Sequence, residues 1–70
     1  MRIVTQNRNT SIEFDGSEIH TQYGSLIYHT NLSRGNLGKY ESEERAMEVF
    51  DEMHMQWQAD CMSVYYMPER

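Results

Sequence analysis

The single cysteine, Cys61, and the nearest histidine, His54, are the first candidates for chemistry. A thiol activated by an imidazole within hydrogen-bond reach is a common enzymatic nucleophile. On a continuing helix, however, seven residues place the two side chains on one face but roughly 10 Å apart. We therefore expect Cys61 to be a small apolar residue near a helix end, and we predict no catalytic residue in this chain.

Two further histidines, His20 and His29, could lie on neighbouring strands. Two imidazoles do not by themselves make a metal site, which needs several convergent ligands. The sequence also lacks the C-x-x-C, H-E-x-x-H and calcium-loop patterns of common metal sites. We predict neither a metal nor a cofactor, and expect both histidines to pack or hydrogen-bond at the surface.

Acidic residues are concentrated in one part of the chain. Seven acids and one base, Arg45, lie between Glu41 and Asp60, whereas the net charge of the whole chain is −5. The ordinary interpretation is a solvated helix face. A functional one is a row of carboxylates about 5–6 Å apart, which could occupy a basic groove that normally holds nucleic-acid phosphates. The predicted partner-binding residues are Glu41, Glu44, Glu48, Asp51 and Glu52.

A helix must position these carboxylates. Its apolar stripe consists of Ala46, Val49, Phe50, Met53 and Trp57, spaced at i, i+3, i+4, i+7 and i+11. Ser42 is a suitable N-cap, and two glutamates follow it in the first turn, where the helix dipole favours negative charge. We predict a helix over residues 42–60 whose acidic face points away from the core.

The rest of the chain favours strands. Alternating segments separated by turn residues predict an antiparallel meander of about five strands over residues 1–40, with a β-hairpin at Asp15-Gly16. A closing strand at residues 63–67 should lie at a sheet edge and end at Pro68. We therefore expect a single α+β domain over residues 1–70, with the helix on one face of the sheet. The predicted outer sheet face carries His20, Gln22, His29 and Lys39. The predicted core consists of Ile3, Ile12, Phe14, Ile19, Leu26, Tyr28, Leu37, Ala46, Val49, Phe50, Met53, Trp57, Val64 and Tyr66.

Composition limits the cellular context. One cysteine cannot form an internal disulfide, the first residues do not read as a signal peptide, and no apolar run approaches the roughly 20 residues of a membrane span. We expect a soluble protein of the cytoplasm. Six methionines and five tyrosines exceed the needs of one small core, so we also expect a homodimer.

Three segments resemble a group of short proteins common in Firmicutes genomes and their phages: the initial MRIVTQ strand, the Y-E-S-E-E-R-A-M-E-V stretch that begins at Tyr40, and the final VYYMPE strand. The resemblance covers about half of the chain and leaves out residues 9–36. It implies no activity. It does favour a phage or mobile-element source, and a host-directed interaction protein over a metabolic enzyme.

Three functions remain open. The first is a non-enzymatic, anti-CRISPR-like inhibitor that binds a host nuclease effector by mimicking a phosphate backbone. The second is an oligomeric nucleotide binder or sponge, in which tyrosines stack on a base and Arg2 or Arg34 meets a phosphate. The tyrosines proposed for that pocket are Tyr23, Tyr28, Tyr65 and Tyr66. The third is a structural subunit of a larger assembly. Direct binding of nucleic acid is not expected, because the isoelectric point is near 5.0 and the sequence has no basic patch with interleaved aromatic residues.

Overall fold

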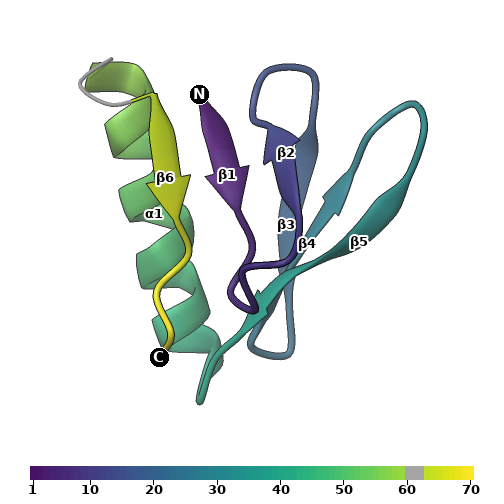
Figure 1. The fold of residues 1–70 in the computed structure, drawn as a ribbon. Coiled ribbons are helices and arrows are strands. Elements are labelled where there is room, and N and C mark those ends of the chain that lie inside the picture. The colour runs from purple at the N-terminus through teal and green to yellow at the C-terminus, as the bar shows by residue number, and fades with distance from the viewer. Residues whose placement is uncertain (60–62) are drawn as a thin grey trace.

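The fold belongs to the α+β class, with antiparallel hairpins, one helix and a C-terminal strand, as predicted. The computed structural model describes residues 1–59 and 63–70 (Figure 1). The elements in chain order are β1 (Arg2–Val4), β2 (Ser11–Glu13), β3 (Glu18–Gln22), β4 (Ser25–His29), β5 (Arg34–Lys39), α1 (Glu43–Ala59) and β6 (Val64–Tyr66).

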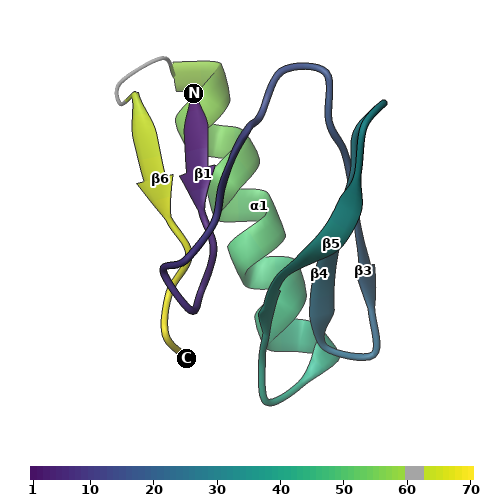
Figure 2. The same ribbon diagram turned by 45° about the vertical axis from the view of Figure 1, so that its right-hand side comes forward.

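The strands form two three-stranded sheets. In the first sheet, of order β2-β1-β6, β2 runs antiparallel to β1 and β6 runs parallel to it. The closing strand therefore lies at an edge, as predicted. The second sheet, of order β3-β4-β5, is an antiparallel meander. Figures 1 and 2 show α1 on one side of both sheets, running alongside β1 and β6.

The predicted hairpin at Asp15-Gly16 is wrong in one respect, because the strands on either side belong to different sheets. The turn itself forms: Ser17 N–H donates to the Phe14 carbonyl at 3.2 Å, and Gly16 has φ of 83°, which suits glycine. Beyond β2, Phe14 packs against aromatic residues of α1. The predicted five-strand meander is therefore divided between β2 and β3, where Phe14 packs against α1.

Gln6 joins the two sheets. Its backbone N–H donates to the Leu37 carbonyl at 2.8 Å, and its side-chain oxygen accepts from Lys39 N–H at 2.9 Å. Its Nε2 donates to the carbonyls of Lys39, Pro68 and Glu69 at 2.9–3.2 Å. One side chain therefore connects the end of β1, the end of β5 and the C-terminal segment, a role that its polar type alone does not predict.

The core lies between α1 and the inner faces of both sheets. Eight of the predicted core residues are buried: Ile3, Ile12, Leu26, Tyr28, Leu37, Ala46, Val49 and Met53. Phe14, Ile19 and Phe50 are partly buried and pack against them.

Three other core predictions fail or hold only in part. Tyr66 is 59% exposed and Val64 is half-buried, whereas Tyr65 and Met67 are buried. The reason is that Tyr65 pairs with the inward-facing Ile3, and paired residues of neighbouring strands share a face.

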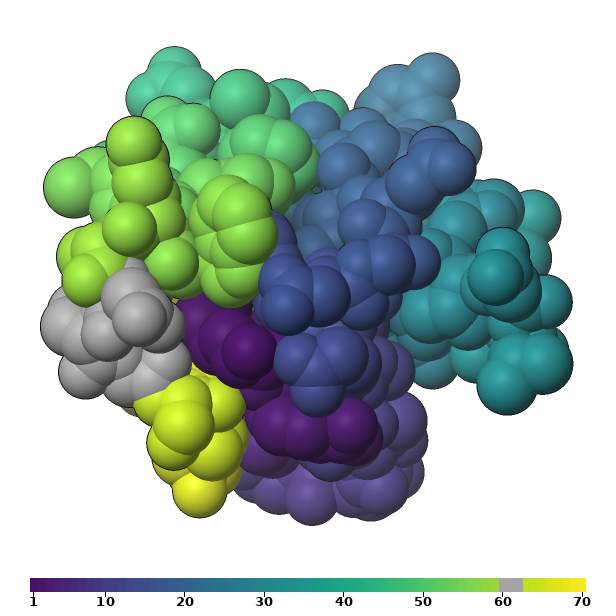
Figure 3. Space-filling model, turned by 90° about the horizontal axis from the view of Figure 1, so that it is seen from above, coloured from purple at the N-terminus to yellow at the C-terminus, as the bar shows by residue number. Residues whose placement is uncertain are grey.

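Trp57 is the third exception, at 47% exposure. Its ring centre lies 5.5 Å from that of Phe14, and its Nε1–H donates to Asp15 Oδ1 at 2.8 Å. Seen from above, the last turns of α1 lie against the turn after β2 (Figure 3). Trp57 therefore fixes that turn to the helix from the edge of the core.

Candidate protein-binding surface

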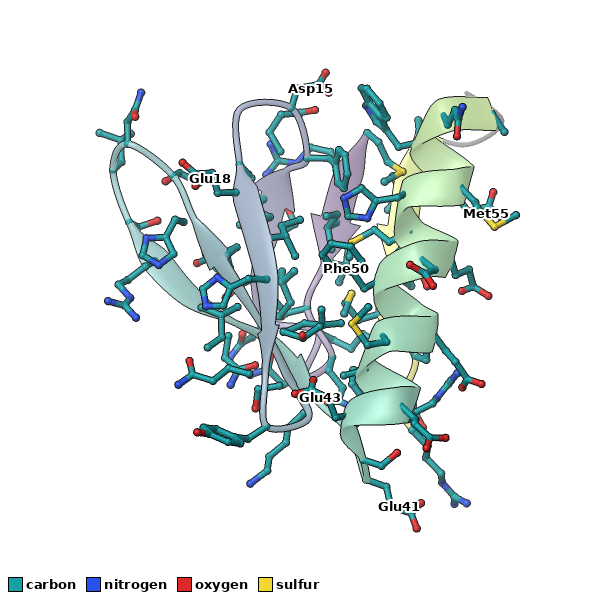
Figure 4. All side chains as sticks on the ribbon, turned by 180° about the vertical axis from the view of Figure 1, so that it is seen from behind. Asp15, Glu18, Glu41, Glu43, Phe50 and Met55 are labelled. Atoms are coloured by element: carbon teal, nitrogen blue, oxygen red, sulfur yellow. The ribbon has the colours of Figure 1, made fainter. Side chains whose placement is uncertain are left out.

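Three of the predicted site residues lie together on one face of α1. Glu44, Glu48 and Asp51 are exposed and follow one another at spacings of four and three residues. The buried residues Ala46, Val49 and Met53 occupy the opposite side. Met55, which is 67% exposed, continues the exposed row by one turn and points away from the sheets (Figure 4). We call Glu44, Glu48, Asp51 and Met55 the outer face of α1.

The carboxylates of this face remain largely uncompensated. Neither Glu44 nor Asp51 forms a hydrogen bond or ion pair within residues 1–59 and 63–70. Glu48 pairs with Arg45 at 3.3 Å, but both side chains are well exposed to solvent, and exposed pairs contribute little. The local field of the outer face is therefore negative.

The other two predicted residues lie elsewhere. Glu52 accepts a hydrogen bond from the Tyr65 hydroxyl, so it connects α1 to β6 and does not belong to the outer face. Burial and this hydrogen bond raise the pKa of Tyr65. Glu41 precedes the helix and lines an open cavity of about 380 Å³. Its other lining residues are Lys39, Tyr40, Arg45, Glu69 and Arg70.

The C-terminal segment forms one wall of this cavity. The Tyr40 hydroxyl donates to the Pro68 carbonyl at 2.8 Å, and Arg45 donates through Nε and Nη2 to the Arg70 carbonyl at 2.9 and 2.6 Å. Burial raises the pKa of Tyr40 to about 12, against an opposing effect of Arg45. Arg45, one of the cations that line the cavity, is therefore already hydrogen-bonded within the protein.

The start of α1 has the predicted cap and one unpredicted contact. Ser42 Oγ accepts a hydrogen bond from Arg45 N–H at 3.1 Å, as an N-cap does. Glu43 Oε2 accepts one from Tyr23 N–H, in the β3–β4 turn, at 3.0 Å. The first turn of the helix is therefore anchored to the second sheet. Nothing in the sequence pattern distinguishes Glu43 from the neighbouring acids.

The four tyrosines proposed for a nucleotide pocket do not gather. Tyr28 and Tyr65 are buried in the core, whereas Tyr23 is exposed in the β3–β4 turn and Tyr66 is exposed on β6 of the other sheet. Arg2, one proposed phosphate ligand, donates to Ser11 and pairs with Glu13 instead. These tyrosines therefore form no common pocket within one chain, and the predicted oligomeric pocket stays a prediction.

The candidate catalytic base, His54, is engaged by other residues of the protein. His54 lies against Phe14 and Phe50, and its Nδ1 is 2.7 Å from the Phe50 carbonyl oxygen. Cys61 lies outside the described residues. Within the described part of the chain, no three His, Cys, Asp or Glu side chains are arranged to hold a metal ion. No helix there is long and apolar enough to cross a membrane.

Comparison of the chain with protein-family models, with curated proteins and with solved structures finds no match. A function for this chain must therefore be argued from its own surface.

Proposed function

We propose that this protein is a non-enzymatic protein-binding module that inserts the outer face of α1 into a basic groove of a partner. The observation that carries the proposal is the row of Glu44, Glu48 and Asp51, solvent-exposed on one side of a helix and compensated, among the described residues, by a single weak ion pair. A rigid helix keeps successive carboxylates about 5–6 Å apart, so they can meet cations that bind successive phosphates. Met55 would add apolar contact at the end of the row.

The partner that fits this surface is a protein of basic, nucleic-acid-binding character. We propose a nuclease effector of a host defence system, with the chain acting in the host cytoplasm as a phage- or mobile-element-encoded inhibitor of the anti-CRISPR kind. The resemblance of the first residues, the helix and the last strand to phage and Firmicutes proteins supports this source. Charge complementarity supports the type of groove, because opposite charges accelerate encounter and disfavour wrong partners.

We also propose that the chain forms a homodimer. Exposed Tyr66 and Leu32 supply apolar surface outside the core, and a domain of this size has a thin stability margin. A strictly monomeric mass in light scattering at tens of micromolar would exclude the dimer. The inhibitor proposal does not depend on this result.

The function is tested by binding to purified CRISPR nuclease effectors, with and without guide RNA, at low and high salt. We expect the dissociation constant to rise steeply with ionic strength, because exposed charges are screened. The double variant Glu44→Gln, Asp51→Asn should weaken binding by about ten-fold.

The matched control is Glu18→Gln, Glu69→Gln, which removes the same charge outside the outer face. Equal effects of the two double variants would indicate that net charge, and not the outer face, determines binding. An affinity indifferent to salt and to both variants would remove phosphate mimicry altogether.

A further inference from the structure

Two histidines lie side by side on the outer side of the second sheet. His20 pairs with Ile27 and His29 pairs with Glu18, so His20, His29 and Glu18 all point to one face of the β3–β4 ladder. The two imidazole centres are 5.8 Å apart. Sequence analysis could not predict this approach, because it depends on the register of the two strands.

Glu18, His20 and His29 form no hydrogen bond or ion pair with any residue that the structure describes. Glu18 and His20 are exposed and His29 is half-buried. His54 differs, because one of its ring nitrogens is already engaged by the Phe50 carbonyl.

The spacing of the two rings is close to that of two ligands on one metal ion. Zinc–nitrogen bonds of about 2.0–2.1 Å at a tetrahedral angle place two imidazole centres roughly 5 Å apart. A side-chain rotation that brings the ring centres together by less than about 1 Å would match this spacing, and one nitrogen of each ring must also turn toward the ion. Glu18, directly opposite His29 and turned away from α1 in Figure 4, has an oxygen-bearing side chain at the adjoining position.

We propose that His20, His29 and Glu18 bind a divalent transition-metal ion of the zinc class, for which imidazole is a suitable ligand. The three groups do not converge in their present rotamers, so binding requires the exposed Glu18 side chain to swing toward the rings, with water as the remaining ligand. Arg34, which pairs with His29 from β5, opposes a bound cation. Its long exposed side chain can turn into solvent, so we expect a modest affinity.

The metal would cross-link β3 to β4. The site faces away from α1, because Thr21, the neighbour of His20 with the opposite orientation, contacts Met47 of the helix at 3.7 Å. It is therefore separate from the outer face of α1, and either proposal can fail without the other. A ligand that binds only the folded chain also raises its melting temperature.

The test is a calorimetric titration with zinc chloride in a Cys61→Ser background, where no thiol can compete for the ion. We expect one zinc per chain. His20→Ala and His29→Ala should each weaken binding at least about ten-fold, and Glu18→Gln by severalfold. Gln22→Ala, an exposed position on the same face of β3, is the matched control and should leave binding unchanged.

A second measurement does not depend on variants. In NMR spectra of the parent, zinc should shift the imidazole signals of His20 and His29 and leave those of His54 in place. An unchanged dissociation constant in any of the three ligand variants overturns the site. An equal loss in Gln22→Ala, or zinc-induced shifts centred on His54, overturns it as well.

Discussion

At the scale of single residues, Tyr23 has an unfavourable backbone conformation. The β3–β4 turn has positive φ at both central residues, 50° at Tyr23 and 83° at Gly24. Hairpin turns of this kind favour Asn-Gly, because a side chain with a large Cβ substituent is strained there. The Tyr23 ring is 88% exposed, so little packing within the chain offsets the strain.

Replacing Tyr23 by asparagine should therefore stabilise the protein. We expect Tyr23→Asn to raise the free energy of unfolding by about 0.5–1 kcal/mol, because asparagine tolerates the left-handed region. Urea denaturation measures the change. Tyr66→Asn is the control: Tyr66 is also exposed but lies in a strand, where asparagine is unfavourable, so this variant should lose stability. A less stable Tyr23→Asn protein would mean that the ring contributes to the fold after all.

The helical pattern predicts which carboxylates can reach solvent, but not which ones form hydrogen bonds within the protein. Glu44, Glu48 and Asp51 lie on the outer face as expected, whereas Glu52 bonds to Tyr65 and Glu43 to the Tyr23 amide. Both of these contacts join groups that are distant in sequence. They exist because β6 and the β3–β4 turn lie beside the helix, which local pattern does not encode.

At the scale of elements, periodicity predicts the orientation of α1 well but that of β6 poorly. A helix of 17 residues has several apolar positions that together define its buried side. A strand of three residues has an alternation but no strong indication of which half faces inward. The pairing of Ile3 with Tyr65 determines which side of β6 faces the core. Because this pairing joins residues distant in sequence, the local pattern does not predict it.

The orientation of α1 can be checked with two methionines that are two residues apart and lie on different sides of the helix. Met53 is fully buried, whereas Met55 is 67% exposed. Met53→Ala should therefore cost about 2–5 kcal/mol of unfolding free energy by leaving a cavity, and Met55→Ala should change it by less than about 0.5 kcal/mol. Chemical denaturation compares the two directly. Similar losses at both positions would contradict the helix orientation and, with it, the outer face.

At the scale of the whole molecule, one hydrogen-bonded junction joins both short sheets, the helix and the C-terminal segment. Gln6 forms hydrogen bonds with Lys39 of β5 and with the C-terminal segment. The Tyr40 hydroxyl, just after β5, donates to the Pro68 carbonyl, and the Tyr65 hydroxyl of β6 donates to Glu52 of α1. Each sheet has only three strands and needs the helix to cover its apolar face. We therefore expect the elements to unfold together, and the ionisation of the two tyrosines to affect the entire fold.

This junction predicts a loss of stability at alkaline pH. Burial raises the pKa of Tyr40 to about 12 and that of Tyr65 further, from ordinary values near 10. Below pH 10 both tyrosines are neutral in the folded and unfolded chains, so their contribution is fully present. Above pH 10 the unfolded chain releases these protons first, and stability falls until the folded pKa is reached.

Between pH 8 and pH 11, the two tyrosines together should remove about 3 kcal/mol of unfolding free energy, since one pKa unit is worth about 1.4 kcal/mol per group. Urea denaturation at both pH values measures the loss. The double variant Tyr40→Phe, Tyr65→Phe will be less stable at pH 8, because it lacks two hydrogen bonds. Its further loss on going to pH 11 should nevertheless be clearly smaller than that of the parent. If both proteins lose the same amount, these tyrosines ionise as freely in the folded chain as in the unfolded one, and the junction is open to water.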